Sequence, residues 1–230
     1  MAQEVHRNLV LTKGGTKAVA TDEASRSLFD LGEPPWVKDE EAARCSNCQT
    51  AFTFFVRKHH CRFCGDLYCS KCSPSAVPSL RQGYIDPVRL CEDCRTVVAK
   101  DNEFIQKHLP VLVTGAMFIV NETPTLCCIS SAHRDLTFGE EHDPVSLQSI
   151  HKVEDIQNDA GNVTGVRLAC RSAGAAGVEA SLELHVDNAD KNKKRSLMFI
   201  GCLKRGLQVL HGPTPTSPRK KKAKEMKVEQ

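Results

Sequence analysis

The chain has 230 residues, of which 40% are hydrophobic and 26% are charged, and its net charge is +3 at neutral pH. This length accommodates one or two domains, and no stretch approaches the roughly 18 consecutive apolar residues needed to cross a bilayer. Positive charge gathers around Arg57 and in the tail from Arg219 to Lys227. Since no aromatic residues accompany that charge along a nucleic-acid-binding face, we expect no nucleic acid partner.

Residues 1–33 are predicted to form a flexible leader. The segment is polar, contains Gly14-Gly15 and is followed by Pro34-Pro35. Its first eleven residues lack the continuous apolar run of a signal peptide, so we expect a cytosolic protein.

Eight cysteines between residues 45 and 94 form four CxxC pairs. The pairs are Cys45/Cys48, Cys61/Cys64, Cys69/Cys72 and Cys91/Cys94. A CxxC unit places two thiolates on one tight turn, and two such units complete a tetrahedral Cys₄ zinc site. The pattern therefore predicts two structural zinc ions. The spacing alone leaves open which pairs share an ion.

The alternative, a disulfide scaffold in a secreted protein, fits poorly with the remaining cysteines. These lie in apolar segments, where free thiols behave as small hydrophobic residues. They are Cys127, Cys128, Cys170 and Cys202. Their placement indicates a reducing compartment, in which CxxC repeats are typical of metal sites.

Three motifs surround the paired cysteines: Trp36-Val-Lys-Asp39, Arg57-Lys-His-His-Cys-Arg62 and Arg89-Leu-Cys91. With the cysteine spacing, they resemble the FYVE zinc finger family, whose WxxD, R(R/K)HHCR and RVC motifs they match except for Leu90 in place of Val. The resemblance covers residues 34–99. It implies a cross-brace module of two small antiparallel β-hairpins and a C-terminal helix, which binds phosphatidylinositol 3-phosphate on endosomal membranes.

The resemblance also implies interleaved zinc ligation. One ion would be held by Cys45, Cys48, Cys69 and Cys72, and the other by Cys61, Cys64, Cys91 and Cys94.

Arginines in these motifs are the predicted phosphate ligands. A phosphomonoester carries about two negative charges, and guanidinium groups match its oxygens with charge-assisted hydrogen bonds. We therefore assign phosphate contacts to Arg57, Arg62 and Arg89, and additional charge at the headgroup or membrane to Lys58. The shared zinc site is expected to bring Arg89 beside the basic strand.

Two histidines, His59 and His60, have more than one interpretation. They could be zinc ligands, but the eight cysteines already fill both zinc sites. They could also be packed in the core. The resemblance instead places both in the headgroup pocket. Because a dianionic neighbour favours the protonated imidazole, we expect tighter membrane binding at pH 6 than at pH 8.

An acidic residue beside this pocket is expected to set specificity. The carboxylate of Asp39 can accept hydrogen bonds from inositol hydroxyls, and it would repel a phosphate at those positions. Alternatively, Asp39 is an exposed helix cap. Trp36 is expected to pack against the module and thereby position Asp39.

Between Cys48 and Arg57 lies a loop with three aromatic residues, Phe52, Phe54 and Phe55. A core this small cannot bury them all. The resemblance places Phe52 inward, and Phe54 and Phe55 at a tip that inserts into the membrane. The alternative is packing of this tip against the second domain or a partner chain.

A second domain is expected over residues 104–211. A short helix is predicted between Thr96 and His108, ended by Pro110. Strand patterns follow at residues 117–120, 126–129, 162–169 and 181–186, with turns at Gly161-Asn162 and Gly174–Gly177. A helix with one apolar face follows at residues 195–211. This order is similar to a pleckstrin-homology (PH)-like β-barrel with a capping helix.

The chain is therefore predicted to be a two-domain adaptor, peripheral on the early endosome membrane, with no catalytic activity. Residues 104–211 are the predicted contact for a protein partner. Residues 212–230 are expected to be a disordered basic tail, whose run from Lys220 to Lys224 is a membrane-attracting patch, a nuclear-localisation signal or a solvated end.

Two alternatives to the lipid-binding adaptor remain: a Rab-effector-like zinc scaffold and a RING-like ubiquitin ligase. The intact basic core and WxxD motif argue against the Rab-effector-like scaffold, and the cysteine spacing, the basic core and the absence of a His ligand argue against the RING-like ligase. The sequence leaves open whether the chain forms a homodimer.

Overall fold

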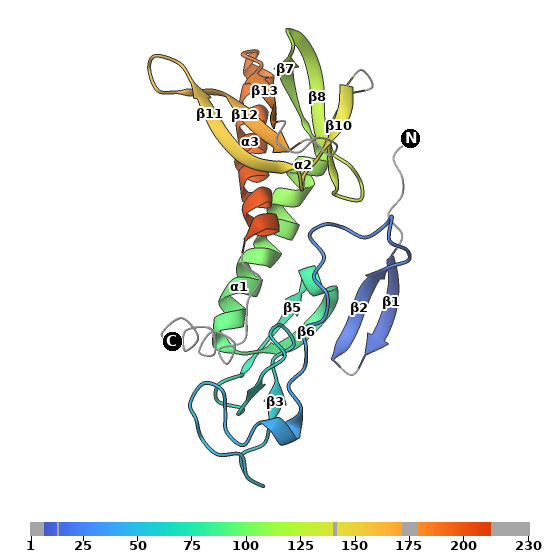
Figure 1. Cartoon of the computed structure of the whole chain (residues 1–230), viewed down its shortest axis with the longest axis vertical. Coiled ribbons are helices and arrows are strands. Elements are labelled where there is room, and N and C mark those ends of the chain that lie inside the picture. Colours follow the sequence, from blue (N-terminus) through green and yellow to red (C-terminus); the bar gives the residue numbers. More distant parts are fainter. Residues whose placement is uncertain (1–6, 13, 140–141, 172–178, 213–230) are drawn as a thin grey trace. The chain divides into compact units, whose positions relative to one another are not determined.

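The computed structural model describes residues 7–12, 14–139, 142–171 and 179–212 (Figure 1). These residues form two compact units. The first contains residues 7–21 and 30–103, and the second contains residues 22–29 and 104–212. Among the described residues, no helix is both long and apolar enough to cross a bilayer.

The first unit contains two short antiparallel hairpins followed by a helix, as expected. β3 (His59–His60) pairs with β4 (Leu67–Tyr68), and β5 (Ser75–Ser79) pairs with β6 (Tyr84–Leu90). A one-turn 3₁₀ helix, η1 (Asp39–Glu41), precedes β3, and a second, η2 (Leu80–Gln82), lies between β5 and β6. α1 (Glu92–Glu103) follows β6 and contacts β5.

The predicted flexible leader instead contains a hairpin of β1 (Arg7–Thr12) and β2 (Gly15–Ala20). β2 pairs with β6, so the strand order is β1-β2-β6-β5. Lys17 fixes the hairpin to the module. Its ammonium lies 4.7 Å from the ring centroid of Tyr84 and 3.0 Å from a carboxylate oxygen of Glu33. The polar composition of this segment concealed two short strands, which pair from Arg7 with Ala20 to Thr12 with Gly15.

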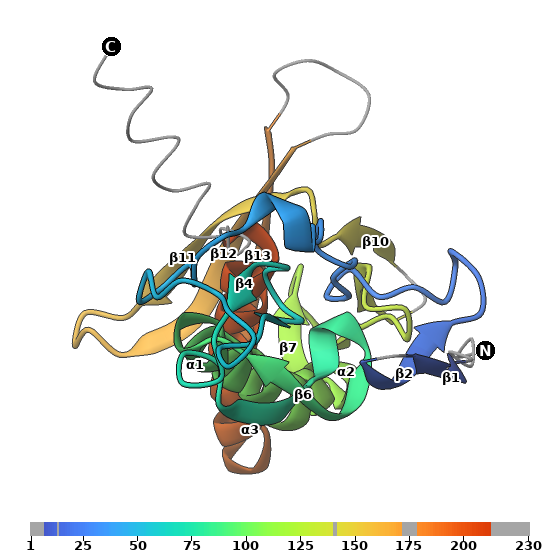
Figure 2. The ribbon, with the colours of Figure 1, turned by 90° about the horizontal axis from the view of Figure 1, so that it is seen from below.

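The second unit is built on one seven-stranded antiparallel sheet, with the order β10-β9-β8-β7-β13-β12-β11. Its strands are β7 (Ala116–Val120), β8 (Thr123–Ile129), β9 (Asp135–Phe138), β10 (His142–Ser146), β11 (Ile150–Gln157), β12 (Val163–Arg171) and β13 (Glu179–Val186). Four strands form one meander and three form another, and pairing between β7 and β13 joins the two meanders (Figures 1 and 2).

The four predicted strands of this sheet and the amphipathic helix are confirmed, but a closed barrel is not found. In the described part of the chain, β10 and β11 are the free edges of an open sheet. The strands β9, β10 and β11 were not predicted. The turn expected at Gly174–Gly177 and the tail beyond residue 212 lie outside the described residues.

α3 (Asp190–His211) packs against β7, β12 and β13. The rings of Phe118 and Phe199 lie 5.5 Å apart between them, and both side chains are fully buried. Three of the four later cysteines, all except Cys128, are buried in this unit. Burial raises the pKa of Cys127 to about 12, so its thiol behaves as a small hydrophobic group.

The helix predicted between Thr96 and His108 begins earlier than expected and does not end at Pro110. α1 is followed by a π-helical turn, η3 (Phe104–His108), and then by α2 (Leu109–Thr114). Pro110 lies at the start of α2, where a missing N–H group costs no hydrogen bond.

Candidate metal centre and lipid-binding surface

The eight paired cysteines form two groups of four. The first consists of Cys45, Cys48, Cys69 and Cys72, and the second of Cys61, Cys64, Cys91 and Cys94. Within each group the sulfur atoms all lie within 4.8 Å of one another. Alternate CxxC pairs thus converge on each site, which is the interleaved arrangement that the resemblance implies.

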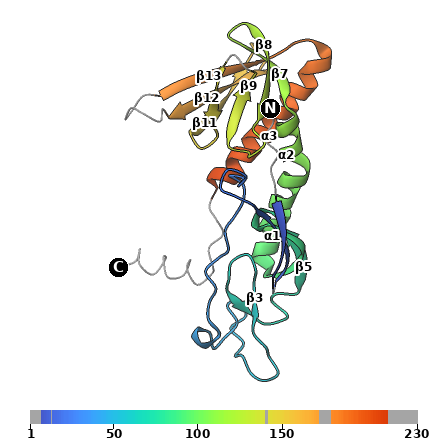
Figure 3. The ribbon, with the colours of Figure 1, turned by 90° about the vertical axis from the view of Figure 1, so that its right-hand side faces the viewer.

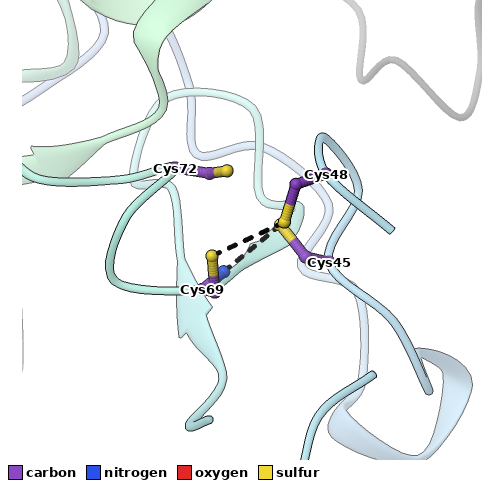
Figure 4. A group of neighbouring side chains, drawn as sticks. All are labelled: Cys45, Cys48, Cys69 and Cys72. Atoms are coloured by element: carbon purple, nitrogen blue, oxygen red, sulfur yellow. Dashed lines mark hydrogen bonds between the residues drawn. The ribbon is translucent and has the colours of Figure 1, made fainter. Parts of the chain in front are cut away.

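The sulfur positions fit zinc. A zinc–sulfur bond of about 2.3 Å in a tetrahedron places neighbouring sulfurs about 3.8 Å apart. In the first group, the Cys48 and Cys69 sulfurs lie 3.8 Å apart. The four side chains of this group point toward a common centre (Figure 4). The Cys69 amide also donates to the Cys45 sulfur at 3.4 Å, a bond that favours a thiolate. The two groups are positioned to bind two zinc ions.

Each CxxC unit is closed by the same main-chain hydrogen bond. The residue after the second cysteine donates its N–H to the carbonyl of the first cysteine, at 2.9 to 3.2 Å. The donors are Gln49, Gly65, Ser73 and Arg95. This turn brings both thiolates of a pair to one side. Two of the donors, Gln49 and Gly65, adopt positive φ, at 59° and 79°.

The basic motif lies on and around β3, beside the second cysteine group. The Arg62 amide donates to the Arg89 carbonyl oxygen at 2.9 Å, which brings together two arginines far apart in the sequence. One guanidinium N–H of Arg62 donates to the His60 carbonyl at 2.8 Å, and one of Arg89 donates to the Ser73 carbonyl at 2.6 Å. Since a guanidinium has five donors, both arginines retain donors for a phosphate. Arg57 is exposed at the start of the motif.

His59 lies among the three arginines. Burial lowers its pKa below the usual value, and the positive charges of Arg89, Arg57 and Arg62 lower it further. These four residues therefore form one positively charged cluster. A bound phosphate dianion would oppose this shift, so the expected preference for acidic pH remains a prediction.

His60 connects the basic strand to the WxxD motif. Its Nε2 atom lies 2.7 Å from the Val37 carbonyl oxygen and 3.8 Å from a carboxylate oxygen of Asp39. Its ring centroid lies 5.1 Å from that of Trp36, whose ring also lies 5.4 Å from the Arg62 guanidinium carbon. Trp36 therefore packs against the pocket residues themselves, a contact that the sequence did not specify.

Asp39 lies at the start of η1, with its side chain 60% exposed. Its carbonyl oxygen accepts a 2.5 Å hydrogen bond from Lys58 Nζ, so the lysine fixes the acidic turn beside the basic strand. The structure thus brings Asp39 next to Lys58 and His60, as the lipid-pocket hypothesis requires.

Gly65, which sequence reasoning did not select, holds the WxxD segment in place. Its carbonyl accepts a hydrogen bond from the Val37 amide at 3.0 Å. A Cβ atom at this position would lie only 2.4 Å from the Pro35 carbonyl oxygen. The glycine after the second CxxC pair was the available signal, because close backbone approach is a common reason for glycine.

The loop between the first cysteine pair and the basic motif exposes two aromatic side chains. Phe54 is 83% exposed and Phe55 is 91% exposed, and their rings meet edge to face with centroids 5.5 Å apart. Phe52 is half-buried and packs against the core that contains both cysteine groups. Two adjacent exposed phenylalanines form an apolar patch of the kind that marks an interaction surface.

The model of the FYVE zinc finger family matches residues 35–100, the region of both cysteine groups and all three motifs. The chain belongs to the FYVE zinc finger family. A second family model, described as the C-terminus of zinc finger FYVE domain-containing protein 21, matches residues 103–214. The second unit is therefore similar to the C-terminus of a FYVE protein.

Solved structures similar to this chain also contain FYVE domains. The tandem VHS and FYVE domains of Hrs, a protein involved in membrane trafficking and signal transduction, match with 34% identity and a TM-score of 0.28. That match covers 30% of this chain and 30% of the other. The LM5-1 FYVE domain from Leishmania major matches with 40% identity and a TM-score of 0.26, and covers 28% of this chain and 76% of that domain.

Proposed function

We propose that this protein is a non-catalytic adaptor recruited to early endosomal membranes through phosphatidylinositol 3-phosphate. The proposal rests chiefly on one juxtaposition: three arginines and two histidines gather beside an acidic turn, in a zinc-stabilised module that exposes two phenylalanines. A headgroup site and an apolar tip on one small module are what recognition of a lipid at a membrane surface requires.

The charged groups are suited to a singly phosphorylated inositol ring. Arg57, Arg62 and Arg89 supply positive charge around His59. A phosphate at the 3-position would pair with them through charge-assisted hydrogen bonds. Asp39 would accept hydrogen bonds from ring hydroxyls, and its carboxylate would repel additional phosphates.

Lys58 and His60 complete the proposed headgroup set. Both contact Asp39 or the main chain beside it. Since the basic and acidic groups lie at different places in the pocket, they would fix the orientation of a bound headgroup. A uniformly basic patch would not.

Membrane insertion supplies the second part of the proposed binding. Phe54 and Phe55 would enter the bilayer interface, and burial of a Phe side chain contributes roughly 1.5–3 kcal/mol. Neither this tip nor the headgroup site would hold the protein firmly alone. The two together would restrict the protein to membranes that display the lipid.

The test is flotation of the zinc-loaded chain with liposomes that contain phosphatidylinositol 3-phosphate. We expect binding that is lost in Arg62→Ala. Equal flotation with liposomes that lack any phosphoinositide would contradict the proposal and favour a general charge attraction.

Residues 34–99 would then be the membrane-binding domain, and residues 104–211 the domain that contacts a protein partner. The second unit has a sheet of two joined meanders, followed by the helix α3. A PH-like domain would have the same order of elements, so the proposal includes a PH-like relationship for this unit.

A further inference from the structure

A groove of about 380 Å³ lies between α2 and α3, wholly within the C-terminal unit. Its lining residues are Pro110, Val111 and Thr114 from α2, and Lys191, Lys194, Arg195 and Met198 from α3. The α3 residues are spaced by three or four positions, so they share one face of the helix. The two helices run side by side in Figure 3.

The apolar part of this groove is open to water. Met198 is 50% exposed, although α3 buries its opposite face in the core through residues such as Ile200. On α2, Val111 lines the groove and is only half-buried. An exposed methionine beside this valine provides an adaptable apolar surface that a partner can cover.

Positive charge borders the groove at a position where it does not stabilise the helix. Lys191, Lys194 and Arg195 lie in the first two turns of α3, where the helix dipole is already positive. Cations at this end cost helix stability. Lys191 also interacts with the Asp187 carboxylate, but neither that carboxylate nor the dipole explains Lys194 and Arg195. Further along α3, by contrast, Lys204 forms an ion pair with Asp155.

Arg195 is held in place without using its charge on an acidic partner. Its Nε atom donates to the Gly115 carbonyl oxygen at 2.8 Å, directly after α2. No carboxylate among the side chains that the structure describes forms an ion pair with Lys194 or Arg195. The groove therefore presents cationic groups beside an apolar floor.

We propose that the α2/α3 groove binds a segment of a partner protein in which apolar side chains alternate with carboxylates. The apolar side chains would cover Val111 and Met198, and the carboxylates would pair with Lys191, Lys194 and Arg195. An apolar floor bordered by cations matches a peptide segment that carries both apolar side chains and carboxylates. The volume lies within the range of roughly 300–1,000 Å³ that is typical of ligand pockets.

This inference does not depend on the lipid-binding proposal, because it concerns only residues of the second unit. It gives the expected partner contact of residues 104–211 a location and a partner chemistry.

The test is selection from a display library of random peptides about twelve residues long, with the full zinc-loaded chain as target. We expect enrichment of peptides that combine Asp or Glu with large apolar residues. Their affinity, measured by fluorescence anisotropy, should fall at least about tenfold in the variant Lys191→Glu with Lys194→Glu. Because acidic residues stabilise a helix N-terminus, this variant should remain folded.

Lys193→Glu is the matched control, since Lys193 is exposed in the same turns of α3 but does not line the groove. Its peptide affinity should stay within about twofold of wild type, apart from the general effect of a two-unit change in net charge, which is half that of the double variant. The proposal is overturned by enrichment without acidic residues, by no enrichment, or by peptides that bind the double variant normally. It is also overturned if the double substitution abolishes binding to phosphatidylserine vesicles and leaves peptide binding intact, because the groove then serves the membrane.

Discussion

Replacing both tip aromatics, in the variant Phe54→Ala with Phe55→Ala, should weaken binding to vesicles that contain phosphatidylinositol 3-phosphate. The two side chains are 83% and 91% exposed, so nearly their whole surface is available for insertion. Burial of each is worth roughly 1.5–3 kcal/mol, and the alanine methyl group that remains recovers about 0.8 kcal/mol. The double variant therefore loses about 1.4–4.4 kcal/mol, which corresponds to about tenfold to about a thousandfold in affinity.

Vesicle affinity of the purified chain is measured by flotation or surface plasmon resonance, and zinc content by elemental analysis. Zinc should stay at two ions per chain, because Phe54 and Phe55 contribute nothing to either cysteine group. Leu9→Ala with Leu11→Ala is a matched control. These leucines are 69% and 83% exposed in the same unit but lie on β1, away from the loop in sequence, so their replacement should not change binding.

Affinity of the phenylalanine variant within about twofold of wild type would refute membrane insertion. An equal loss in the leucine control would show that apolar exposure in general, and not this loop, drives the association.

Three further predictions concern the zinc module. Gly65→Ala should lower the thermal midpoint of the module more than Gly15→Ala does. Both glycines lie in the first unit and have positive φ, but a Cβ at Gly65 meets a carbonyl oxygen at 2.4 Å, whereas one at Gly15 meets the Asp86 side chain at 3.4 Å. Equal midpoints would exclude a close-approach role. Strong chelation should unfold residues 36–98 and leave the second unit folded. The sole tryptophan, Trp36, reports this step by its fluorescence, and unchanged emission after verified metal loss would contradict it. Asp39→Asn should increase binding to more highly phosphorylated inositides in a liposome series, because it removes the repelling carboxylate. Glu40→Gln, in the same turn, should not. An unchanged lipid preference in Asp39→Asn would refute the repulsion argument.

The zinc module could be predicted from sequence because its geometry follows from short-range chemistry. A CxxC unit and its closing hydrogen bond are local, so four units give two sites whatever the rest of the chain does. The grouping of Cys45 with Cys69, and of Cys61 with Cys91, is not local, and only the resemblance supplied it. The structure confirms that grouping.

Contacts made through the main chain could not be predicted in the same way. The shared zinc site predicted that Arg89 lies beside the basic strand, but the hydrogen bond from the Arg62 amide to the Arg89 carbonyl uses backbone atoms, so no side-chain pattern encodes it. The packing of Trp36 on His60 and Arg62 likewise depends on how Gly65 lets the chain approach.

Strands at the sheet edges were the elements most often missed. β10 and β11 border the open sheet of the second unit, and β1 borders the sheet of the first. Edge strands need not be apolar on both faces, and β10 also contains Pro144. The sequence of β11, which includes His151, Lys152 and Glu154, therefore lacks a clear alternation. The central strands β7, β12 and β13, with buried faces, were predicted correctly.

The most direct test of the central claim is liposome flotation across the full phosphoinositide series, with wild type and Arg62→Ala compared at equal zinc content. The account predicts that wild type floats with phosphatidylinositol 3-phosphate in preference to every other inositide, and that Arg62→Ala loses this binding while it keeps both zinc ions. Wild-type flotation that follows only the total negative charge of the vesicle, or an Arg62→Ala variant that still prefers the 3-phosphate, would contradict it.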